Sequence, residues 1–233
     1  MILLRRSSER GHANHGWLDS QHTFSFAGYH DPEWMGFGPL RVVNEDRVAA
    51  GGGFAPHSHA NMEIISYVIE GALQHRDSLG TGSVISPGDV QCMSAGSGIE
   101  HSEFNASQTD PVHFLQVWIQ PNQLNAKPRY GQSHYPVASR RGLLRLVASP
   151  DGADASLPIR QDARVYASVL APGEAVALAI GAGRKAWVQV VRGAVVLGEE
   201  TRLGAGDAAG INAQTAVHLR AESDCEILVF DLP

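Results

Sequence analysis

The sequence predicts an all-β protein built as two tandem barrels, and three observations support this fold class. Short apolar runs rich in β-branched and aromatic residues are cut repeatedly by Gly, Pro, Asn and Asp, which is typical of strands separated by turns. No long stretch keeps the 3.6-residue period of an amphipathic helix. One pattern of strand and glycine turn occurs twice along the chain. Closure of each half into a barrel would hide its sheet edges.

Each expected strand is a run of four to six residues with turn residues on both sides. The clearest examples, in chain order, are residues 40–43, 64–69, 114–119, 187–191 and 226–230. Runs of this length with Val, Ile, Phe and Trp are too short for most helices and suit strands.

The internal repeat sets the expected domain boundaries. In the first copy a strand reaches a turn at Gly71 and a later turn carries Gly88-Asp89; in the second copy the matching features are Gly193 and Gly206-Asp207. A polar, Pro-bearing stretch lies between the copies. We therefore expect an N-terminal barrel over residues 1–120, a crossover linker over 121–142 and a C-terminal barrel over 143–233.

Composition and charge exclude several classes of function. The 233 residues carry a formal net charge of -6 and no concentrated basic cluster, which disfavours direct nucleic-acid binding. No segment approaches membrane-spanning length, and the N-terminal apolar run is too short for an export signal. The two cysteines, Cys92 and Cys225, are far apart and outside any metal-binding spacing. We expect a cytoplasmic protein with free thiols and no membrane association.

Two short motifs carry the candidate chemistry. His57 and His59 follow a run of three glycines, and His101 and Glu103 follow a second glycine-rich turn. Residues two apart on a strand point to the same face, so each pair projects into one space. A single His-x-His is often incidental, but two such pairs of matching parity predict one mononuclear site in the first barrel. Three imidazoles and a carboxylate suit a divalent transition metal and leave coordination positions open.

Other polar residues have weaker claims on this site. Glu63 shares parity with His57 and His59, so we expect it to face the barrel interior, as a base beside the metal or as a charge at the mouth. Histidines elsewhere in the first half are assigned structural or surface roles; these are His12, His15, His22, His30, His75 and His113. In the second half, equal spacing from the repeated glycines places Ala179, Gly181, Leu219 and Ala221 at the ligand positions, with His218 one step off and alone. The second barrel is thus expected to lack a metal.

These motifs resemble those of the pirin family of bicupins. The resemblance includes the cupin-like pattern from Gly51 through Glu63, the His101-to-Asn105 segment with its extra Glu103, and the segments 17–26, 37–46, 87–91 and 230–233. It covers nearly the whole chain and looks closest to bacterial pirin-like proteins described as quercetin 2,3-dioxygenases. It implies a bicupin of two double-stranded β-helix (jelly-roll) barrels, with Fe(II) or another divalent ion held by His57, His59, His101 and Glu103. Mn, Ni, Co, Cu and Zn are the alternative metals.

The resemblance also implies an activity. A flavonol such as quercetin would bind the metal through its 3-hydroxyl oxygen, Glu103 or Glu63 would take the proton, and dioxygen would open the central ring with loss of carbon monoxide. The expected partners are a small aromatic substrate and dioxygen, and we expect a monomer.

Two other functions need the same four ligands. One is a metal-dependent regulatory or sensor module that acts through protein partners; the other is a cupin enzyme with a different natural substrate. Cavity size distinguishes the dioxygenase from the regulatory or sensor module, because an enzyme needs a pocket of a few hundred Å³ beside the metal.

Overall fold

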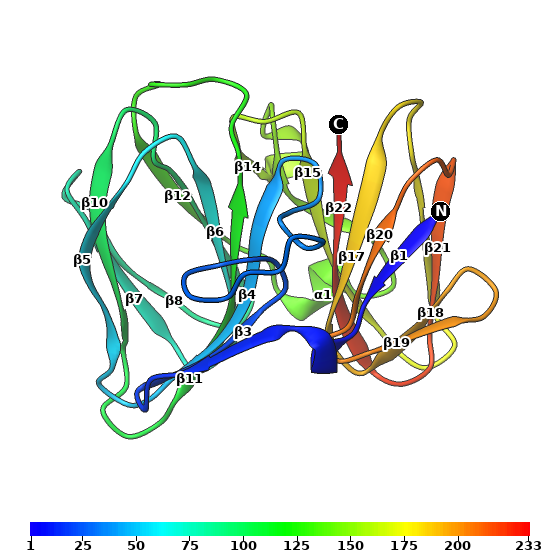
Figure 1. Ribbon diagram of the computed structural model, residues 1–233, viewed down its shortest axis with the longest axis horizontal. Helices are drawn as coiled ribbons and strands as arrows, with labels where there is room; N and C mark the ends of the chain where they lie inside the picture. Colours follow the sequence, from blue (N-terminus) through cyan, green and yellow to red (C-terminus); the bar gives the residue numbers. More distant parts are fainter. The chain divides into compact units, whose positions relative to one another are not determined.

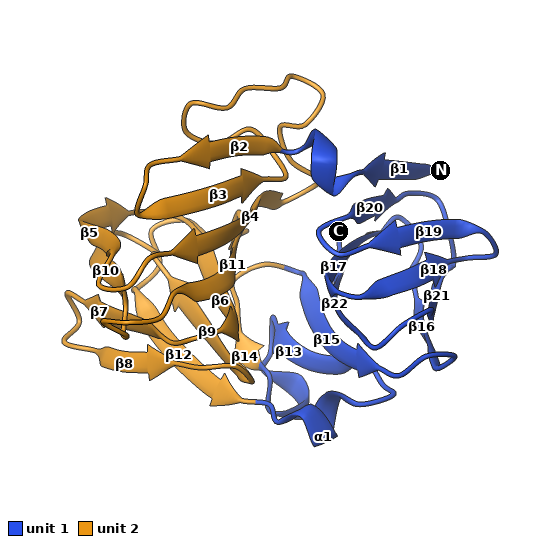
Figure 2. Cartoon of the chain, turned by 90° about the horizontal axis from the view of Figure 1, so that it is seen from below, with its two compact units in different colours: residues 1–10, 135–156, 162–233 blue, residues 11–134, 157–161 orange.

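The computed structural model describes residues 1–233 as two compact units, each built almost entirely of antiparallel strands (Figure 1). The N-terminal unit comprises residues 11–134 and 157–161, and the C-terminal unit comprises residues 1–10, 135–156 and 162–233; Figure 2 colours them orange and blue. The predicted all-β bicupin is confirmed. No helix has the length and hydropathy needed to cross a membrane.

The N-terminal unit consists of two sheets. The larger has the order β12-β9-β6-β11-β4-β3-β2 and the smaller the order β5-β10-β7-β8. Its strands are β2 (Gly11–Asn14), β3 (Leu18–His22), β4 (Leu40–Val48), β5 (Gly53–His59), β6 (Glu63–Glu70), β7 (Leu73–Asp77), β8 (Gly82–Ile85), β9 (Asp89–Ser94), β10 (Ile99–Asn105), β11 (Val112–Ile119) and β12 (Arg129–His134). The two-residue strand β14 (Leu157–Pro158) also belongs to this unit but to neither of these two sheets.

The C-terminal unit repeats this plan. Pairing runs β1-β20-β17-β22-β15-β13 in one sheet and β16-β21-β18-β19 in the other. Its elements are β1 (Ile2–Arg5), a 3₁₀ turn (Ser7–Glu9), α1 (Val137–Arg140), β13 (Arg145–Ser149), a second 3₁₀ turn (Ala153–Ala155), β15 (Arg164–Leu170), β16 (Ala175–Ala179), β17 (Lys185–Arg192), β18 (Ala194–Leu197), β19 (Thr201–Gly204), β20 (Ala208–Ile211), β21 (Ala216–Ala221) and β22 (Cys225–Leu232).

The repeated glycines mark equivalent turns in the two units. Gly71 and Gly193 have φ values of +76° and +72°, in the left-handed region that favours glycine. A Cβ at Gly71 would also meet the carbonyl oxygen of Pro111, and one at Gly193 would meet that of Asp224. Both turns therefore require glycine for space as well as for backbone conformation.

The interior of the N-terminal unit has a polar layer between two apolar clusters. On the inward face of β6, Ser66 lies between Ile64, which belongs to one cluster, and Val68, which belongs to the other. On β11, Gln116 occupies the same level, next to Phe114 of the second cluster. The C-terminal unit instead has one continuous apolar core. The apolar layers hold the first barrel together while leaving one level free for polar chemistry.

The unit boundaries differ from the sequence expectation in three places, one of which is the assignment of residues 157–161 to the N-terminal unit. Residues 1–10 belong to the C-terminal unit, because β1 pairs with β20. The stretch expected to be a crossover linker contains β12, which pairs with β9 over six residues and completes the large sheet of the N-terminal unit. A polar strand such as Arg129–His134 lacks the apolar alternation from which strands are predicted.

Candidate metal centre and its cavity

Three histidines converge where β5 and β10 pair. His57 lies directly opposite His101 across the two strands, and His59 is two residues further along β5. The ring centroids are 4.5 Å apart for His57 and His101, 4.9 Å for His59 and His101, and 4.8 Å for His57 and His59. Strand parity and pairing therefore bring these three imidazoles together, as expected from the sequence.

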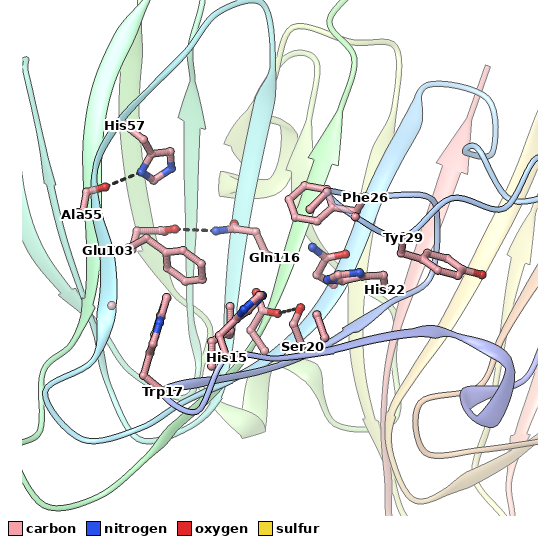
Figure 3. A pocket seen from close by; sticks show the side chains of 18 of the residues that line it. His15, Trp17, Ser20, His22, Phe26, Tyr29, Ala55, His57, Glu103 and Gln116 are labelled. Carbon is pink, nitrogen blue, oxygen red and sulfur yellow. Dashed lines mark hydrogen bonds between the residues drawn. The ribbon is translucent and has the colours of Figure 1, made fainter.

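The imidazole nitrogens are available as metal ligands. Nδ1 of His57 lies 2.8 Å from the carbonyl oxygen of Ala55 and must donate to it, which leaves the Nε2 lone pair free (Figure 3). His101 is 2% exposed, and neither of its ring nitrogens has a hydrogen-bond partner. Two buried nitrogens without partners are costly in a folded protein, and a bound cation would satisfy one of them.

Burial keeps the rings of His59 and His101 neutral, which is the form that binds metals. Burial, followed by the neighbouring His57, lowers the pKa of His59 to about 4. Burial, followed by His57, His59 and His75, lowers the pKa of His101 to about 3. Near neutral pH, both rings therefore offer lone pairs to a cation.

Glu103 is held on the same face of β10 by a set of buried amides and a hydroxyl. Gln116 Nε2 donates to Oε2 at 2.6 Å, Ser66 Oγ lies 3.0 Å from Oε1, and Gln91 Nε2 lies 3.5 Å from Oε1. Glu103 is 1% exposed, and burial raises its pKa, against the opposing effects of His75 and of the hydrogen bonds from Ser66 and Gln116. These contacts fix the carboxylate and leave it able to hold a proton more readily than an exposed glutamate.

His75 is a further candidate ligand that sequence reasoning missed. One set of candidate ligand atoms comprises His57, His59 and His101, and an overlapping, fully buried set comprises His75, His101 and Glu103; within each, the atoms lie within 4.8 Å of one another. Nε2 of His75 donates to Asp77 at 3.0 Å, while its buried Nδ1 has no partner. A carboxylate that orients one imidazole nitrogen is common behind metal-binding histidines. His75 lies directly opposite Glu103, and this position could be predicted only by knowing the β7–β10 register.

Glu63 does not face this site. The chain turns at Asn61, which has a φ of +50°, so the parity of β5 does not carry into β6. On β6 the inward residues are Ile64, Ser66 and Val68. Glu63 is 2% exposed on the opposite face, where it accepts a hydrogen bond from Ser94 Oγ at 2.6 Å. The expectation that it faces the barrel interior was wrong, because it assumed one uninterrupted strand.

His57 and His59 open onto a cavity of about 1140 Å³ within the N-terminal unit. Figure 3 shows His57 and Glu103 towards one end of this cavity and His22, Phe26 and Tyr29 towards the other. Aromatic side chains form part of its walls: Trp17 packs edge-on against Phe54 at 5.2 Å, and Phe26 against Trp118 at 5.4 Å between ring centroids. Such a space suits a flat aromatic molecule.

The N-terminal hairpin also contributes to the cavity, although none of its histidines belongs to the two sets of candidate ligand atoms. His12, His15 and His22 line the cavity, whereas His30 does not. His22 lies on β3, which pairs with β4 so that His22 is opposite Asn44. This pairing helps to place the hairpin against the barrel, and the local sequence of residues 11–22 does not predict it.

In the C-terminal unit the equivalent positions are apolar. The Gly71–Gly193 equivalence and the strand registers match His57, His59, His101 and Glu103 to Leu178, Ile180, Val217 and Leu219. Equal spacing had selected Ala179, Gly181, Leu219 and Ala221, and it was wrong because the loops of the two units differ in length. His218 is exposed on β21, on the outer face of its sheet.

Fold and site together define a bicupin with a candidate divalent metal site in its N-terminal barrel. A family model described as Pirin matches residues 4–119, and one described as the quercetinase C-terminal cupin domain matches residues 146–232. The chain belongs to the pirin family.

Relatives agree with this assignment over the full length. The chain is 46% identical over 233 residues to an Escherichia coli K12 protein named quercetin 2,3-dioxygenase, covering 100% of this chain and 99% of that one. It is 43% identical to a pirin-like protein of Caulobacter vibrioides, covering 99% of each. The crystal structure of the bacterial pirin YhhW from Escherichia coli in complex with nickel(II) is similar, with a TM-score of 0.95, 47% identity and coverage of 100% and 99%.

Proposed function

We propose that this protein is a metal-dependent dioxygenase that opens the central ring of flavonols such as quercetin, with release of carbon monoxide. The observation that carries the proposal is the cluster of His57, His59 and His101 beside a cavity of about 1140 Å³ that has aromatic side chains in its walls. A module that senses only a metal ion needs no such space, so the cavity favours an enzyme over the regulatory alternative. The name of the E. coli relative, quercetin 2,3-dioxygenase, supports the same reaction.

His57, His59 and His101 would hold the ion, with Glu103 beside them. The donor set fits a divalent transition metal, since imidazole and carboxylate ligands accept Fe(II), which we propose as the native ion, and also Mn, Ni, Co, Cu and Zn. When bound, the metal would supply Lewis acidity toward the substrate oxygen and a route for electrons to dioxygen. A nickel(II) complex of a relative supports a divalent ion.

Glu103 is the proposed proton acceptor in this reaction. Its carboxylate lines the cavity together with His57 and His59, and burial raises its pKa. A substrate hydroxyl placed at the histidines could pass its proton to an oxygen of Glu103, whose orientation Gln116 and Ser66 maintain. Glu63 lies on the other face of β6, so we do not assign it this role.

The aromatic walls would orient the substrate and exclude water. Trp118 packs edge-on against both Phe26 and His59, with centroids 5.4 Å and 4.9 Å away. This contact joins the wall of the cavity directly to the metal-binding rings. A planar substrate stacked along it would bring its reacting ring to the histidines and keep solvent from the opened ring system.

Oxygen uptake tests the proposal directly. Metal-free protein loaded with Fe, Mn, Ni, Co or Cu should consume dioxygen with quercetin and release carbon monoxide, whereas metal-free protein should do neither. Glu103→Gln should lower kcat more than it weakens substrate binding, because the amide keeps the shape and loses the basicity. Failure of every loaded sample to exceed the free metal would contradict the proposal. Oxygen uptake with a different aromatic substrate alone would indicate a cupin enzyme of other specificity.

A further inference from the structure

Two buried polar side chains of β4 face the cavity from a wall that carries none of the candidate metal ligands. Asn44 and Asp46 are two residues apart, so they point to the same face, and they are 2% and 4% exposed. Both line the cavity. On β11, Gln116 lies directly opposite Asn44 and joins this wall to Glu103 through its hydrogen bond.

The hydrogen bonding of this pair is incomplete. Ser20, opposite Asp46 on β3, donates its hydroxyl to Asp46 Oδ1. The side-chain oxygen of Asn44 is buried and has no hydrogen-bond partner. A buried acceptor without a donor is costly, and such groups in native proteins usually have a ligand, a water or a function. An acceptor that lines a cavity is placed to receive a donor from whatever fills it.

Asp46 gives this wall a group that can act as a hydrogen-bond donor or as an acceptor. Burial raises the pKa of Asp46 to about 7, with Glu103, Glu45 and Asp19 acting in the same direction and the hydrogen bond from Ser20 opposing them. Near neutral pH its carboxyl group can therefore either donate or accept a hydrogen bond. An acceptor next to a group of this kind is complementary to phenolic hydroxyls, which both donate and accept.

We propose that Asn44 and Asp46 form a polar subsite that binds a ring hydroxyl of the aromatic substrate while another oxygen of the same molecule lies at the histidines. The inference rests on the proposed function and adds a substrate class to it: flavonols that carry hydroxyl groups beyond the one at position 3. Discrimination arises because a substrate without the extra hydroxyls leaves the Asn44 oxygen buried and unpaired.

The experiment compares quercetin with 3-hydroxyflavone, which lacks every other ring hydroxyl. Wild-type protein should favour quercetin by about tenfold or more in kcat/KM, the effect expected for one buried hydrogen bond. Asn44→Leu keeps most of the side-chain volume and removes the acceptor, so the preference for quercetin over 3-hydroxyflavone should fall to about twofold or less. Arg47→Gln is the matched control, because Arg47 is exposed on the same strand and should not alter the preference.

Binding to metal-free protein gives a second readout that does not need catalysis. Quercetin should bind wild-type apoprotein more tightly than 3-hydroxyflavone, by fluorescence quenching, and Asn44→Leu should abolish the difference. Asn44→Ala provides the same test should the leucine variant misfold, with metal content and thermal melting as checks of folding.

The outcomes separate the two proposals. An unchanged preference in a folded, metal-binding Asn44 variant overturns the subsite and leaves flavonol cleavage standing. Absence of oxygen uptake in wild-type protein overturns the proposed function, and the apoprotein binding series then decides the subsite by itself. Equal apoprotein affinity for quercetin and 3-hydroxyflavone in the wild type also overturns the subsite.

Discussion

The two barrels of this protein share one strand plan and differ in what fills it. In the N-terminal barrel the pair His57–His101 joins β5 to β10; in the C-terminal barrel the equivalent pair, Leu178–Val217, joins β16 to β21. Around Glu103, the hydrogen-bonding side chains Ser66, Gln91 and Gln116 correspond by register to Val188, Ala209 and Val229. All three apolar residues belong to the continuous core of the C-terminal barrel.

This difference teaches that the fold does not depend on the polar layer. The flanking apolar clusters are enough to close the first barrel, and the second barrel has an apolar residue at every one of these levels. A buried carboxylate, in contrast, is tolerated only where its donors are present. We therefore expect the ligands and their supporting amides to behave as one unit, so that replacing a single member destabilises the protein more than replacing all of them.

Metal binding should show the largest difference between the barrels. His101→Val and His57→Leu install the C-terminal barrel's residues, and each should weaken metal affinity by about a hundredfold or more, since even supporting partners are worth 10–100-fold. Equilibrium dialysis with elemental analysis measures this. His218→Ala, in the C-terminal barrel, should retain the metal. Loss of metal from that variant, with retention in His57→Leu, would show that the metal binds in the C-terminal barrel and would contradict the prediction.

The polar layer can be tested by substituting one of its residues or by replacing all four with apolar residues. Gln116→Val alone should lower the free energy of unfolding of metal-free protein by about 2–3 kcal/mol, because Glu103 stays buried without its amide donor. Combining it with Ser66→Val, Gln91→Ala and Glu103→Leu should recover most of that loss, because the layer then matches the apolar barrel. Chemical denaturation measures both. Additive destabilisation across the four substitutions would show that the residues do not act as a unit.

Asp46 should make stability depend on pH. Its folded-state pKa of about 7 exceeds the ordinary 3.8, so its stabilising contribution is present at low pH and is lost as pH rises through 7. Asp46→Asn removes this dependence and retains an acceptor for Ser20. The stability of the variant relative to wild type should therefore increase by about 2 kcal/mol between pH 5 and pH 8. Denaturation of both metal-free proteins at the two pH values tests this, and a constant difference would contradict it.

Metal removal should have the smallest effect on the fold. At free metal ten times its Kd, binding contributes about 1.4 kcal/mol, so chelation should lower the melting temperature modestly. The strand signal in circular dichroism should persist at room temperature, because both apolar cores remain. Loss of that signal on adding chelator would show that the metal is needed for folding.

Sequence reasoning succeeded where one strand contains the whole signal. The spacing of His57 with His59, and of His101 with Glu103, fixes a shared face without knowledge of any partner strand. It failed at Glu63, because the turn at Asn61 separates two strands whose parities are unrelated. The tandem repeat predicted the two barrels, but loops of different length shifted the equivalent positions by one or two residues.

Residues that depend on strand pairing were beyond local patterns. His75 reaches the site only through the β7–β10 register, and Asn44 and Asp46 line the cavity only because β4 packs beside β11 and β3. From the sequence alone, each of these residues is equally well explained as an ordinary polar residue of a strand. Only the tertiary structure shows that it lies at the site or in the cavity wall.

The location of the metal is the central claim, and anomalous diffraction tests it most directly. Crystals of the nickel- or manganese-loaded protein, measured at the metal absorption edge, should give one strong peak per chain, about 2.0–2.2 Å from nitrogens of His57, His59 and His101 and beside Glu103. The C-terminal barrel should give none. A principal peak at His218 or elsewhere outside the N-terminal barrel, or no peak in fully loaded protein, would contradict the account.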